Sequence, residues 1–480
     1  MTFTTLTFLI FFVVVFALYW SLRSRTAQNV LLVTAGYVFY GWWDWHYCLL
    51  MIAASFLDFF VGLGLNRAEV TWKRKLLLTI GLSGNLGMLG FFKYFNFFAE
   101  NFQLAAAKLG WQVDAITLNV VLPVGISFYT FQTMSYSIDI YRRKMRGTTH
   151  LLEYLSYVSF FPQLVAGPIE RATHLLPQFF KERIFSPAMA MDGCKQILWG
   201  LFRKMVIADN LAPIVDAAFS NPTAYNGAEL ALATLCFAFQ IYCDFSGYSD
   251  IAIGIAKLLG FDLMRNFAYP YFSQSVGEFW RRWHISLSTW FKDYVYFPLG
   301  GSRVSRARNV FNILVTFLLS GLWHGASWNF LIWGALNGLG VLPDLLRASH
   351  SKRNATDIPV ERPSLIAFAK ILVTFMFICL GWVFFRAQTF GGAMLILKRI
   401  VGSFLSSAGG LIAHHDPTDG RVLFMIALLI ALEWWKRGHA QPLVFERWPV
   451  ALRWAAYSVV FWTVIYLGTY GSSTFIYFQF

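Results

Sequence analysis

The sequence predicts an all-α polytopic membrane protein, and three observations support this fold class. Hydrophobic residues make up 57% of the 480-residue chain and charged residues 13%, against roughly 25% charged in ordinary soluble domains. Apolar runs of roughly 18–25 residues recur along the chain, which is the length that a helix needs to cross a bilayer. The basic residues fall in short loops between these runs, as the positive-inside rule requires.

The first third of the chain is the most regular. The loop Arg67–Lys75 holds four basic residues and one acid, and Arg142–Arg146 holds four basic residues and no acid. Because cytoplasmic loops carry an excess of Lys and Arg, alternating crossings that place both loops inside put the N-terminus on the extracytoplasmic side. The expected spans here are Phe3–Trp20, Val30–Trp43, Tyr47–Leu65, Leu76–Phe98 and Leu118–Tyr141.

The middle of the chain does not divide into simple crossings. The segments Leu151–Gly167, Leu230–Tyr242 and Ile251–Phe261 are short or broken, and Phe267–Gly301 is interrupted by Pro and Gly. Irregular backbone is tolerated at membrane depth only where it is buried in protein or lines a wet cavity. We therefore expect re-entrant or interfacial helices around an internal cavity.

Strong helical character resumes in the last third. Together with the earlier spans it predicts about eleven transmembrane helices in one membrane-embedded domain, residues 1–480. The segment Ser349–Pro363 is the one hydrophilic linker, and no internal repeat is visible. The apolar segments of this part are Asn312–Ala348, Leu365–Phe385, Val422–Trp435 and Leu452–Tyr470.

Composition and motif searches argue against several classes of function. The formal net charge is +14, but the chain has no polybasic tail. We therefore expect it to lie in the lipid bilayer and not to bind nucleic acid. The five cysteines lack paired or metal-ligand spacing, and nucleotide-loop and zinc motifs are absent, so we expect no metal. The run His414-His415-Asp416 lies in a Gly-rich polar loop, where surface imidazoles are expected.

A histidine inside a charge-free apolar segment is the strongest candidate for chemistry. The segment Asn312–Phe330 has no charged side chain, and it contains His324. An ionisable group at membrane depth is unfavourable unless it is paired, hydrated or has a function there. The position of His324 therefore indicates an intramembrane site. The alternative is a neutral imidazole that is hydrogen-bonded and structural.

A second histidine, His284, lies among aromatic and charged residues. On the functional interpretation this segment forms the mouth of a cavity, where Arg281, Arg282 and Lys292 attract the phosphates of an anionic ligand. On the alternative interpretation it is an amphipathic helix in the membrane interface whose arginines extend towards water.

Three acids in apolar surroundings require partners. Asp244 could orient a histidine or pair with an arginine. Asp250 is better placed to cap a helix that begins near Ile251. Glu170 lies next to Arg171, and we expect a local ion pair there.

Several of these segments also resemble the membrane-bound O-acyltransferase family, and within it the bacterial branch of alginate O-acetyltransferase-like membrane subunits. The similar segments follow in order through most of Leu122–Gly334, whereas the helices before and after them agree mainly in character. The segments are Leu122–Gln132, Phe161–Ile169, Gln240–Asp250, Glu278–Ser288, Phe291–Gly301 and Gly321–Asn329.

The resemblance implies that His324 is the catalytic intramembrane histidine, that His284 is the second characteristic polar position, and that a central tunnel crosses the membrane. It implies an O-acetyltransferase of the bacterial inner membrane, with cytoplasmic acetyl-CoA as the acyl-donor substrate and no bound cofactor. The acetyl group would pass to extracytoplasmic partner proteins that modify an exopolysaccharide such as alginate.

For this chemistry we expect His324 to act as general base, because a neutral imidazole can take the proton of an attacking hydroxyl. His284, Asn329 and Ser320 are the candidates for stabilising the developing oxyanion. An acetyl-histidine intermediate is the covalent alternative.

Other functions remain open at this point. The acceptor could instead be cellulose, peptidoglycan or teichoic acid. Outside catalysis, the chain could be a transporter, which would typically show an internal repeat, or a non-catalytic membrane platform.

Overall fold

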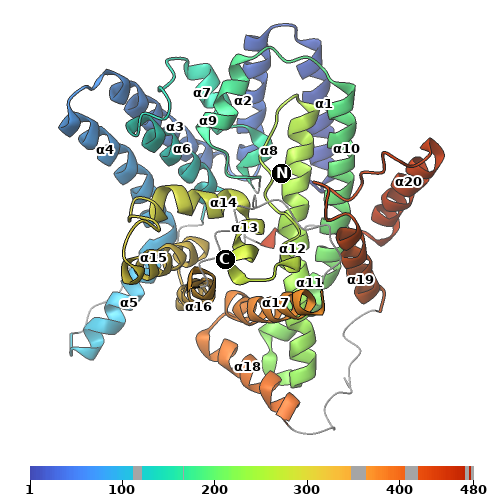
Figure 1. Cartoon of the computed structure of the whole chain (residues 1–480). Helices are drawn as coiled ribbons and strands as arrows, with labels where there is room; N and C mark the ends of the chain where they lie inside the picture. Colours follow the sequence, from blue (N-terminus) through green and yellow to red (C-terminus); the bar gives the residue numbers. More distant parts are fainter. Residues whose placement is uncertain (112–121, 166, 347–363, 406–419, 471–474, 477–480) are drawn as a thin grey trace. The chain divides into compact units, whose positions relative to one another are not determined.

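The computed structural model describes residues 1–111, 122–165, 167–346, 364–405, 420–470 and 475–476. Within these residues the regular structure is helical: α-helices α1–α20 with short 3₁₀ and π segments η1–η6 (Figure 1). The predicted all-α fold class is confirmed. The predicted linker Ser349–Pro363 and the run His414–Asp416 lie outside the described residues.

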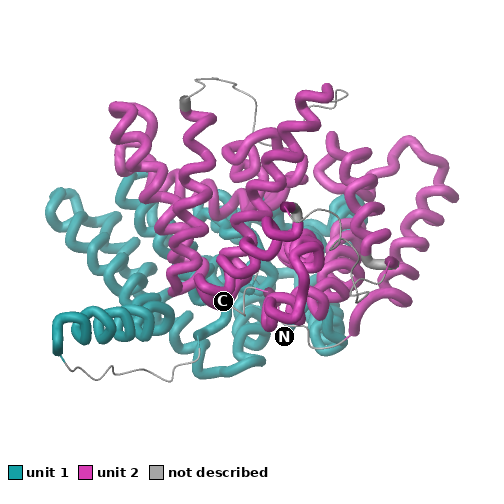
Figure 2. The backbone as a smooth tube through the Cα atoms, turned by 90° about the horizontal axis from the view of Figure 1, so that it is seen from below, with its two compact units in different colours: residues 1–194, 252–264 teal, residues 195–251, 265–480 magenta. Residues whose placement is uncertain are grey.

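The helices form two compact units, drawn in teal and magenta in Figure 2. Unit 1 comprises Met1–Cys194 and Ala252–Met264, and unit 2 comprises Lys195–Ile251 and Arg265–Phe480. The single membrane domain expected over residues 1–480 stays a prediction.

Unit 1 contains the regular first third of the chain, and its helices match the spans expected there. The span expected over Leu118–Tyr141 corresponds to α6, and residues 118–121 lie outside the described residues. The broken segment Leu151–Gly167 is confirmed as two short helices, the second with Pro162 in its first turn, where its missing N–H is not needed. The elements are α1 (Leu6–Ser21), α2 (Arg25–Gly41), α3 (His46–Arg67), α4 (Thr71–Leu89), η1 (Gly90–Tyr94), α5 (Phe95–Lys108), α6 (Ile126–Tyr141), α7 (Leu151–Val158), α8 (Phe161–Leu164), α9 (Ala172–Leu175), η2 (Leu176–Phe180) and the first part of α10 (Pro187–Leu201).

A buried polar cluster joins α3, α4 and α6 in unit 1. The carboxylate of Asp58 accepts hydrogen bonds from the side chains of Asn85 and Ser137, and the Thr133 hydroxyl donates to the side-chain oxygen Oδ1 of Asn85 at 3.1 Å. Lipid tails are as apolar as the helix surfaces, so hydrogen bonds of this kind help membrane helices to associate.

Unit 2 contains the remaining elements. The expected irregular segment Phe267–Gly301 is confirmed: it is built of short helices separated by turns (Figure 1). The helix α18 and the pair α10–α11 were not expected from the sequence. The elements are η3 (Phe202–Ala208), α11 (Asp209–Ser220), η4 (Pro222–Ala224), α12 (Gly227–Leu258, ending in unit 1), η5 (Pro270–Phe272), α13 (Val276–Arg282), α14 (Ile285–Phe291), η6 (Lys292–Tyr296), α15 (Arg306–His324), α16 (Trp328–Leu346), α17 (Leu365–Arg386), α18 (Phe390–Leu405), α19 (Gly420–Trp435) and α20 (Val450–Leu467).

One prediction about the middle of the chain is wrong. The segments Leu230–Tyr242 and Ile251–Phe261 were expected to be separate and short, but α12 is one continuous helix of 32 residues that passes through both. Asp250 therefore lies inside α12 and does not cap a new helix. The acids of this helix form ion pairs with buried cations, so a carboxylate in its middle does not force the helix to end.

By length and composition, five helices among the described residues are able to cross a membrane. This supports a chain with several membrane crossings. The five are His46–Arg67, Thr71–Lys108, Gly227–Leu258, Leu365–Arg386 and Val450–Leu467, and Leu6–Ser21 and Leu423–Trp435 are shorter apolar helices.

Candidate functional site

His324 is the last residue of α15, and the packing of α15 on α16 fixes its place in unit 2. Two glycines allow these helices to approach closely. A Cβ atom on Gly321 would lie 2.2 Å from the carbonyl oxygen of Phe330, and one on Gly334 would lie 2.4 Å from that of Phe317. Small residues are what permit such close contact between membrane helices.

Aromatic rings surround the imidazole of His324. Its ring centroid lies 4.9 Å from Trp323, 5.0 Å from Trp333 and 5.2 Å from Phe385. The side chain is buried, with 4% of the residue exposed. This enclosure limits the access of water to the ring.

His284 lies at the break between α13 and α14 and is fully buried. Its backbone is left-handed, with φ 44° and ψ 55°. Few residues other than glycine adopt this conformation, and it is often retained where a side chain has to be aimed at a functional site. The ring of Phe245 packs edge-on against the imidazole at 4.6 Å.

A residue that the sequence interpretation missed, Asn266, holds the imidazole of His284. The Asn266 Oδ1 atom lies 3.0 Å from His284 Nδ1 and accepts hydrogen bonds from the Ser286 hydroxyl at 2.9 Å and the Ser286 amide at 3.3 Å. The Nδ2 end of the same amide donates to the Ser249 hydroxyl at 2.9 Å. No motif or spacing in the sequence indicates this role.

The structure brings the two predicted histidines into one region of unit 2. The indole of Trp323 lies 6.1 Å from the ring of His284 and 4.9 Å from that of His324, centroid to centroid. Two buried imidazoles therefore lie near the same indole, and imidazole is a side chain suited to accept and donate protons.

Ser320 and Asn329 lie on the two helices that position His324. Ser320 is buried one turn before His324 on α15, and residues four apart share a helix face. The amide of Asn329 donates to the Ala387 carbonyl at 2.7 Å, at the C-terminal end of α17. That contact gives Asn329 a structural task. The oxyanion roles suggested for both residues stay predictions.

The three basic residues near His284 have different environments. Arg281 and Lys292 are exposed, whereas Arg282 is buried and forms an ion pair with Glu278 one turn earlier on α13. The exposed pair is accessible to an anionic ligand. Arg282 instead neutralises a neighbouring carboxylate.

Asp244 belongs to a buried ion-pair network. Its carboxylate lies 2.5 Å from Lys204 Nζ and accepts a hydrogen bond from the Ile476 amide at 2.7 Å. The same ammonium group lies 2.8 Å from Asp209. Asp244 therefore pairs with a lysine, and not with the arginine considered from the sequence.

The neighbouring residue Arg203 forms a second buried network. Its guanidinium contacts Asp250 at 2.7 Å and also the carboxylate of Glu433, to which the Tyr242 hydroxyl donates at 3.0 Å. Arg203 and Lys204 are adjacent on the π-helix η3, a helix type often found at functional sites. Two basic residues inside the apolar stretch around η3 are a sequence signal that could have predicted buried ion pairs here.

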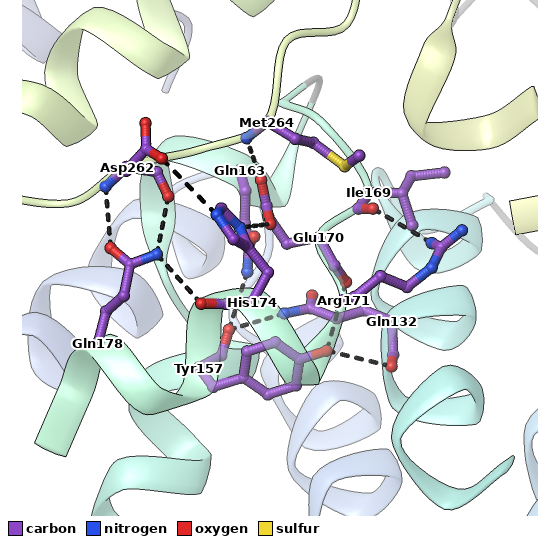
Figure 3. A network of polar contacts seen from close by, with 10 residues as sticks. All are labelled: Gln132, Tyr157, Gln163, Ile169, Glu170, Arg171, His174, Gln178, Asp262 and Met264. Carbon is purple, nitrogen blue, oxygen red and sulfur yellow. Dashed lines mark hydrogen bonds and ion pairs between the residues drawn. The ribbon is translucent and has the colours of Figure 1, made fainter. Parts of the chain in front are cut away.

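In unit 1, the carboxylate of Glu170 lies 2.8 Å from Nδ1 of His174 (Figure 3). The ion pair expected between Glu170 and Arg171 stays a prediction. Glu170 also accepts a hydrogen bond from the Met264 amide at 2.6 Å. Asp262 lies 3.7 Å from the other imidazole nitrogen, and its backbone is held by Gln178. The hydrogen bond to Glu170 is the main cause that raises the pKa of His174 above its ordinary value.

Among the residues that the structure describes, no group of three or more His, Cys, Asp or Glu side chains is placed to hold a metal ion. The candidate site therefore consists of two buried histidines, their aromatic neighbours and hydrogen-bonding residues. Such a site suits proton transfer and nucleophilic chemistry.

Together the apolar helices and the buried histidines define a multi-pass membrane enzyme with its candidate site in unit 2. The model of the MBOAT, membrane-bound O-acyltransferase family, matches residues 91–385. The chain belongs to this family and is an acyltransferase. The matched region includes His284, His324 and Asn266.

Similar curated proteins carry related activities in their names. The chain is 40% identical over 392 residues to "Probable alginate O-acetylase AlgI" of Azotobacter vinelandii, covering 81% of this chain and 75% of that protein. It is 38% identical over 398 residues to "Peptidoglycan O-acetyltransferase" of Helicobacter pylori, covering 77% and 73%. A more distant relative is "Teichoic acid D-alanyltransferase" of Streptococcus thermophilus, 29% identical over 46% of this chain and 56% of that protein.

Proposed function

We propose that the protein is an O-acetyltransferase that takes acetyl groups from cytoplasmic acetyl-CoA for the O-acetylation of an exopolysaccharide such as alginate. Extracytoplasmic partner proteins complete the transfer to the polymer. The observation that carries this proposal is the buried, aromatic-enclosed position of His324 within the region matched by the family. The names of the Azotobacter vinelandii and Helicobacter pylori relatives support acetyl as the group transferred.

The chemistry assigned to His324 is general-base catalysis. As the acceptor hydroxyl oxygen attacks the thioester carbonyl carbon, its proton passes to the imidazole. The carbon–sulfur bond then breaks, and the leaving thiolate of CoA takes up the proton. The aromatic enclosure serves this reaction because exclusion of water prevents hydrolysis of the acetyl group.

The donor side of the proposal rests on the exposed basic pair. Arg281 and Lys292 flank the segment that carries His284, and both side chains are exposed. Cationic groups at such a position attract the phosphates of CoA. The buried Arg282 is left out of this role because Glu278 occupies it.

Contacts within unit 1 support a cytoplasmic position for both basic loops. The guanidinium of Arg74, which lies in the first loop region, donates to the Leu65 carbonyl at the end of α3. It also donates to the Ile140 and Tyr141 carbonyls at the end of α6, where the second basic loop begins. The two loops therefore lie at the same end of this helix group, as positive-inside orientation requires.

We propose that the protein lies in the bacterial inner membrane with its N-terminus extracytoplasmic. Single cysteines at the exposed positions Lys73 and Gly110, in a chain whose native cysteines are replaced, test it. A membrane-impermeant thiol reagent applied to spheroplasts should label Gly110→Cys only. Labelling of Lys73→Cys alone would reverse the orientation and the donor side.

A second acceptor class is favoured by the names of two relatives, which point to peptidoglycan and teichoic acid. On this alternative the chain transfers acyl groups to a cell-wall polymer. The same membrane site would serve either acceptor, because the partner proteins would select the polymer.

The experiment that tests the proposal compares wild-type protein with His324→Gln and with His439→Gln, a matched change at an exposed histidine of unit 2. Membranes from cells that express each form are supplied with radiolabelled acetyl-CoA, and label is counted separately in exopolysaccharide, peptidoglycan and teichoic acid. We expect label in exopolysaccharide with wild type and His439→Gln and none with His324→Gln, because an amide cannot take the proton.

The other outcomes separate the rival functions. Undiminished label with well-folded His324→Gln would support a platform or transporter and contradict catalysis by His324. Label confined to a cell-wall polymer would select the second acceptor class. Absence of transfer by the wild type would contradict the proposed function as a whole.

A further inference from the structure

The orientation of the Asn266 amide is determined by its neighbours. The backbone N–H of Ser286 can only donate, and it points to one end of the amide at 3.3 Å, so that end is the carbonyl oxygen. The opposite end, Nδ2, lies 2.9 Å from the Ser249 hydroxyl, which can accept. If the amide were turned over, the contact with the Ser286 N–H would become donor against donor, whereas the Ser249 hydroxyl, which can also donate, is compatible with either end.

This orientation determines which imidazole nitrogen of His284 carries the proton. The Asn266 carbonyl oxygen lies 3.0 Å from Nδ1. If Nδ1 were unprotonated, two lone pairs would face each other at that distance, which is unfavourable. With a proton on Nδ1, the contact is a hydrogen bond from the imidazole to the amide oxygen.

The backbone reinforces the arrangement. The backbone N–H of Ile285 donates to the backbone carbonyl of Asn266 at 2.9 Å, and the backbone N–H of Ala268 donates to the backbone carbonyl of Arg282 at 2.9 Å. The segment that carries Asn266 is therefore fixed along the break that holds His284 in its left-handed conformation. Neither the side chain nor the backbone of His284 depends on a mobile partner for this contact.

We infer that Asn266 is a positioning residue that keeps neutral His284 in the Nδ1-protonated form, so that Nε2 accepts a hydrogen bond from a substrate hydroxyl other than the one whose proton passes to His324. This inference rests on the proposed function and deepens it. On this inference His284 does not take the oxyanion role suggested for it, because an unprotonated Nε2 cannot donate a hydrogen bond to an oxyanion.

The groups around His284 define what a pH experiment would report. Uncharged side chains contact its ring from α12, α14 and α15: Phe245, Ser286 and Trp323. The titratable side chains next in the chain to these contacts are Asp244, which pairs with Lys204, Arg282, which pairs with Glu278, and His324. The helix α12 also carries Glu229, Asp250 and Lys257, and α15 also carries Arg306 and Arg308.

Replacement of Asn266 by aspartate tests the inference through the pH profile of acetyl transfer. Asn266→Asp keeps an acceptor for Nδ1–H and adds a negative charge that stabilises the imidazolium form. We expect the acidic limb of kcat to move to higher pH by about one unit, since a neighbouring opposite charge shifts a pKa by about 1–3 units. Asn309→Asp is the matched control, because Asn309 is a buried asparagine of unit 2 that accepts from the Tyr296 hydroxyl.

Loss of the acceptor gives a complementary result. Asn266→Ala should lower kcat about tenfold to hundredfold, the range typical for residues that orient a histidine, with little change in the KM for acetyl-CoA. Asn266→Asp should restore much of that loss at high pH. A folded Asn266→Asp enzyme with the wild-type pH profile would overturn the inference.

A direct measurement covers the case in which these variants do not fold. Nitrogen NMR of wild-type protein labelled at its histidine side chains, with His284→Gln to assign the signal, reports which ring nitrogen carries the proton. We expect a protonated Nδ1 and an unprotonated Nε2 at His284. The reverse pattern would overturn the inference even if acetyl transfer is confirmed, whereas missing acetyl transfer with the expected pattern would contradict only the proposed function.

Discussion

The indole of Trp323, near the end of α15, lies 6.1 Å from the imidazole of His284 at the α13–α14 break, centroid to centroid, with the two rings tilted by 58°. Trp323 directly precedes His324 in α15, so the indole that contacts the imidazole of His284 belongs to the residue next to His324. Movement of α15 therefore moves both the second histidine and one wall of the first. Both imidazoles contact the same indole, but they have different proposed roles, so kinetics of single variants should distinguish them.

The first prediction concerns that separation. His324→Ala should abolish measurable acetyl transfer, because it removes the base. His284→Ala removes only a hydrogen-bond acceptor, so its kcat should be at least about tenfold above that of His324→Ala. Steady-state kinetics with purified protein would show this order. Binding of acetyl-CoA, measured by calorimetry, should be unchanged in both. A reversed order of activities would exchange the two roles.

The second prediction concerns the donor. Exposed charge contacts contribute about 0–1 kcal/mol each, so Arg281→Ala and Lys292→Ala should each raise the KM for acetyl-CoA about threefold, and the double variant about tenfold. Higher salt should reduce the difference. Lys398→Ala, which removes an exposed lysine from α18, is the control. An unchanged KM in the double variant would return these residues to a membrane-anchoring role.

The third prediction concerns the buried ion pair between Arg203 and Glu433. Glu433→Leu should lower the free energy of unfolding by about 3 kcal/mol or more, because removal of one partner leaves a buried charge poorly compensated. Thermal unfolding followed by intrinsic fluorescence in detergent would detect the change. Asp216→Asn breaks the contact between Asp216 and Arg386, in which the aspartate is 45% exposed, and should change stability by less than about 1 kcal/mol. Equal effects would argue against the network.

The fourth prediction concerns pH. Because Glu170 and, to a lesser degree, Asp262 raise the pKa of His174 above 6.5, the protonated imidazole stabilises the folded state. This contribution is fully present below pH 6.5 and is lost as the pH rises through the raised value. His174→Gln should therefore reduce the loss of melting temperature between pH 6 and pH 8. The effect should be small, since 43% of the His174 side chain is exposed.

The control for the pH experiment is His150→Gln, which changes an exposed histidine of unit 1. It should leave the pH dependence of the melting temperature as in the wild type. If His174→Gln and His150→Gln behave alike, the contact between His174 and Glu170 does not stabilise the protein in this pH range.

The sequence predicted those parts of the fold that depend on hydrophobic length. The spans of the first third and the interrupted segment Phe267–Gly301 appear in the structure because apolar runs and Pro–Gly breaks act locally. The continuity of α12 could not be predicted in this way. It depends on cations elsewhere in the chain that pair with Asp244 and Asp250.

In the candidate site, too, residues with a local sequence signal could be predicted and residues that depend on distant contacts could not. His324 was singled out because a histidine in a charge-free apolar segment is unusual in itself, and His284 because it lies among aromatic and basic residues. Asn266 was missed because its importance lies in a contact with His284, 18 residues away in the chain, and asparagine in a loop is ordinary. Arg282 was grouped with Arg281 by sequence proximity, but neighbouring helical residues face different directions, and only Arg281 is exposed.

The ion pair on η3 also has a consequence for biogenesis. Glu433 follows Arg203 by 230 residues and Asp250 follows it by 47. During synthesis the guanidinium therefore meets the carboxylate of α12 long before that of α19 has left the ribosome. A nascent chain that stops short of Glu433 carries its arginine with one acid instead of two. The second contact therefore requires synthesis to have passed Glu433, and a chain truncated before α19 has Arg203 paired with Asp250 alone.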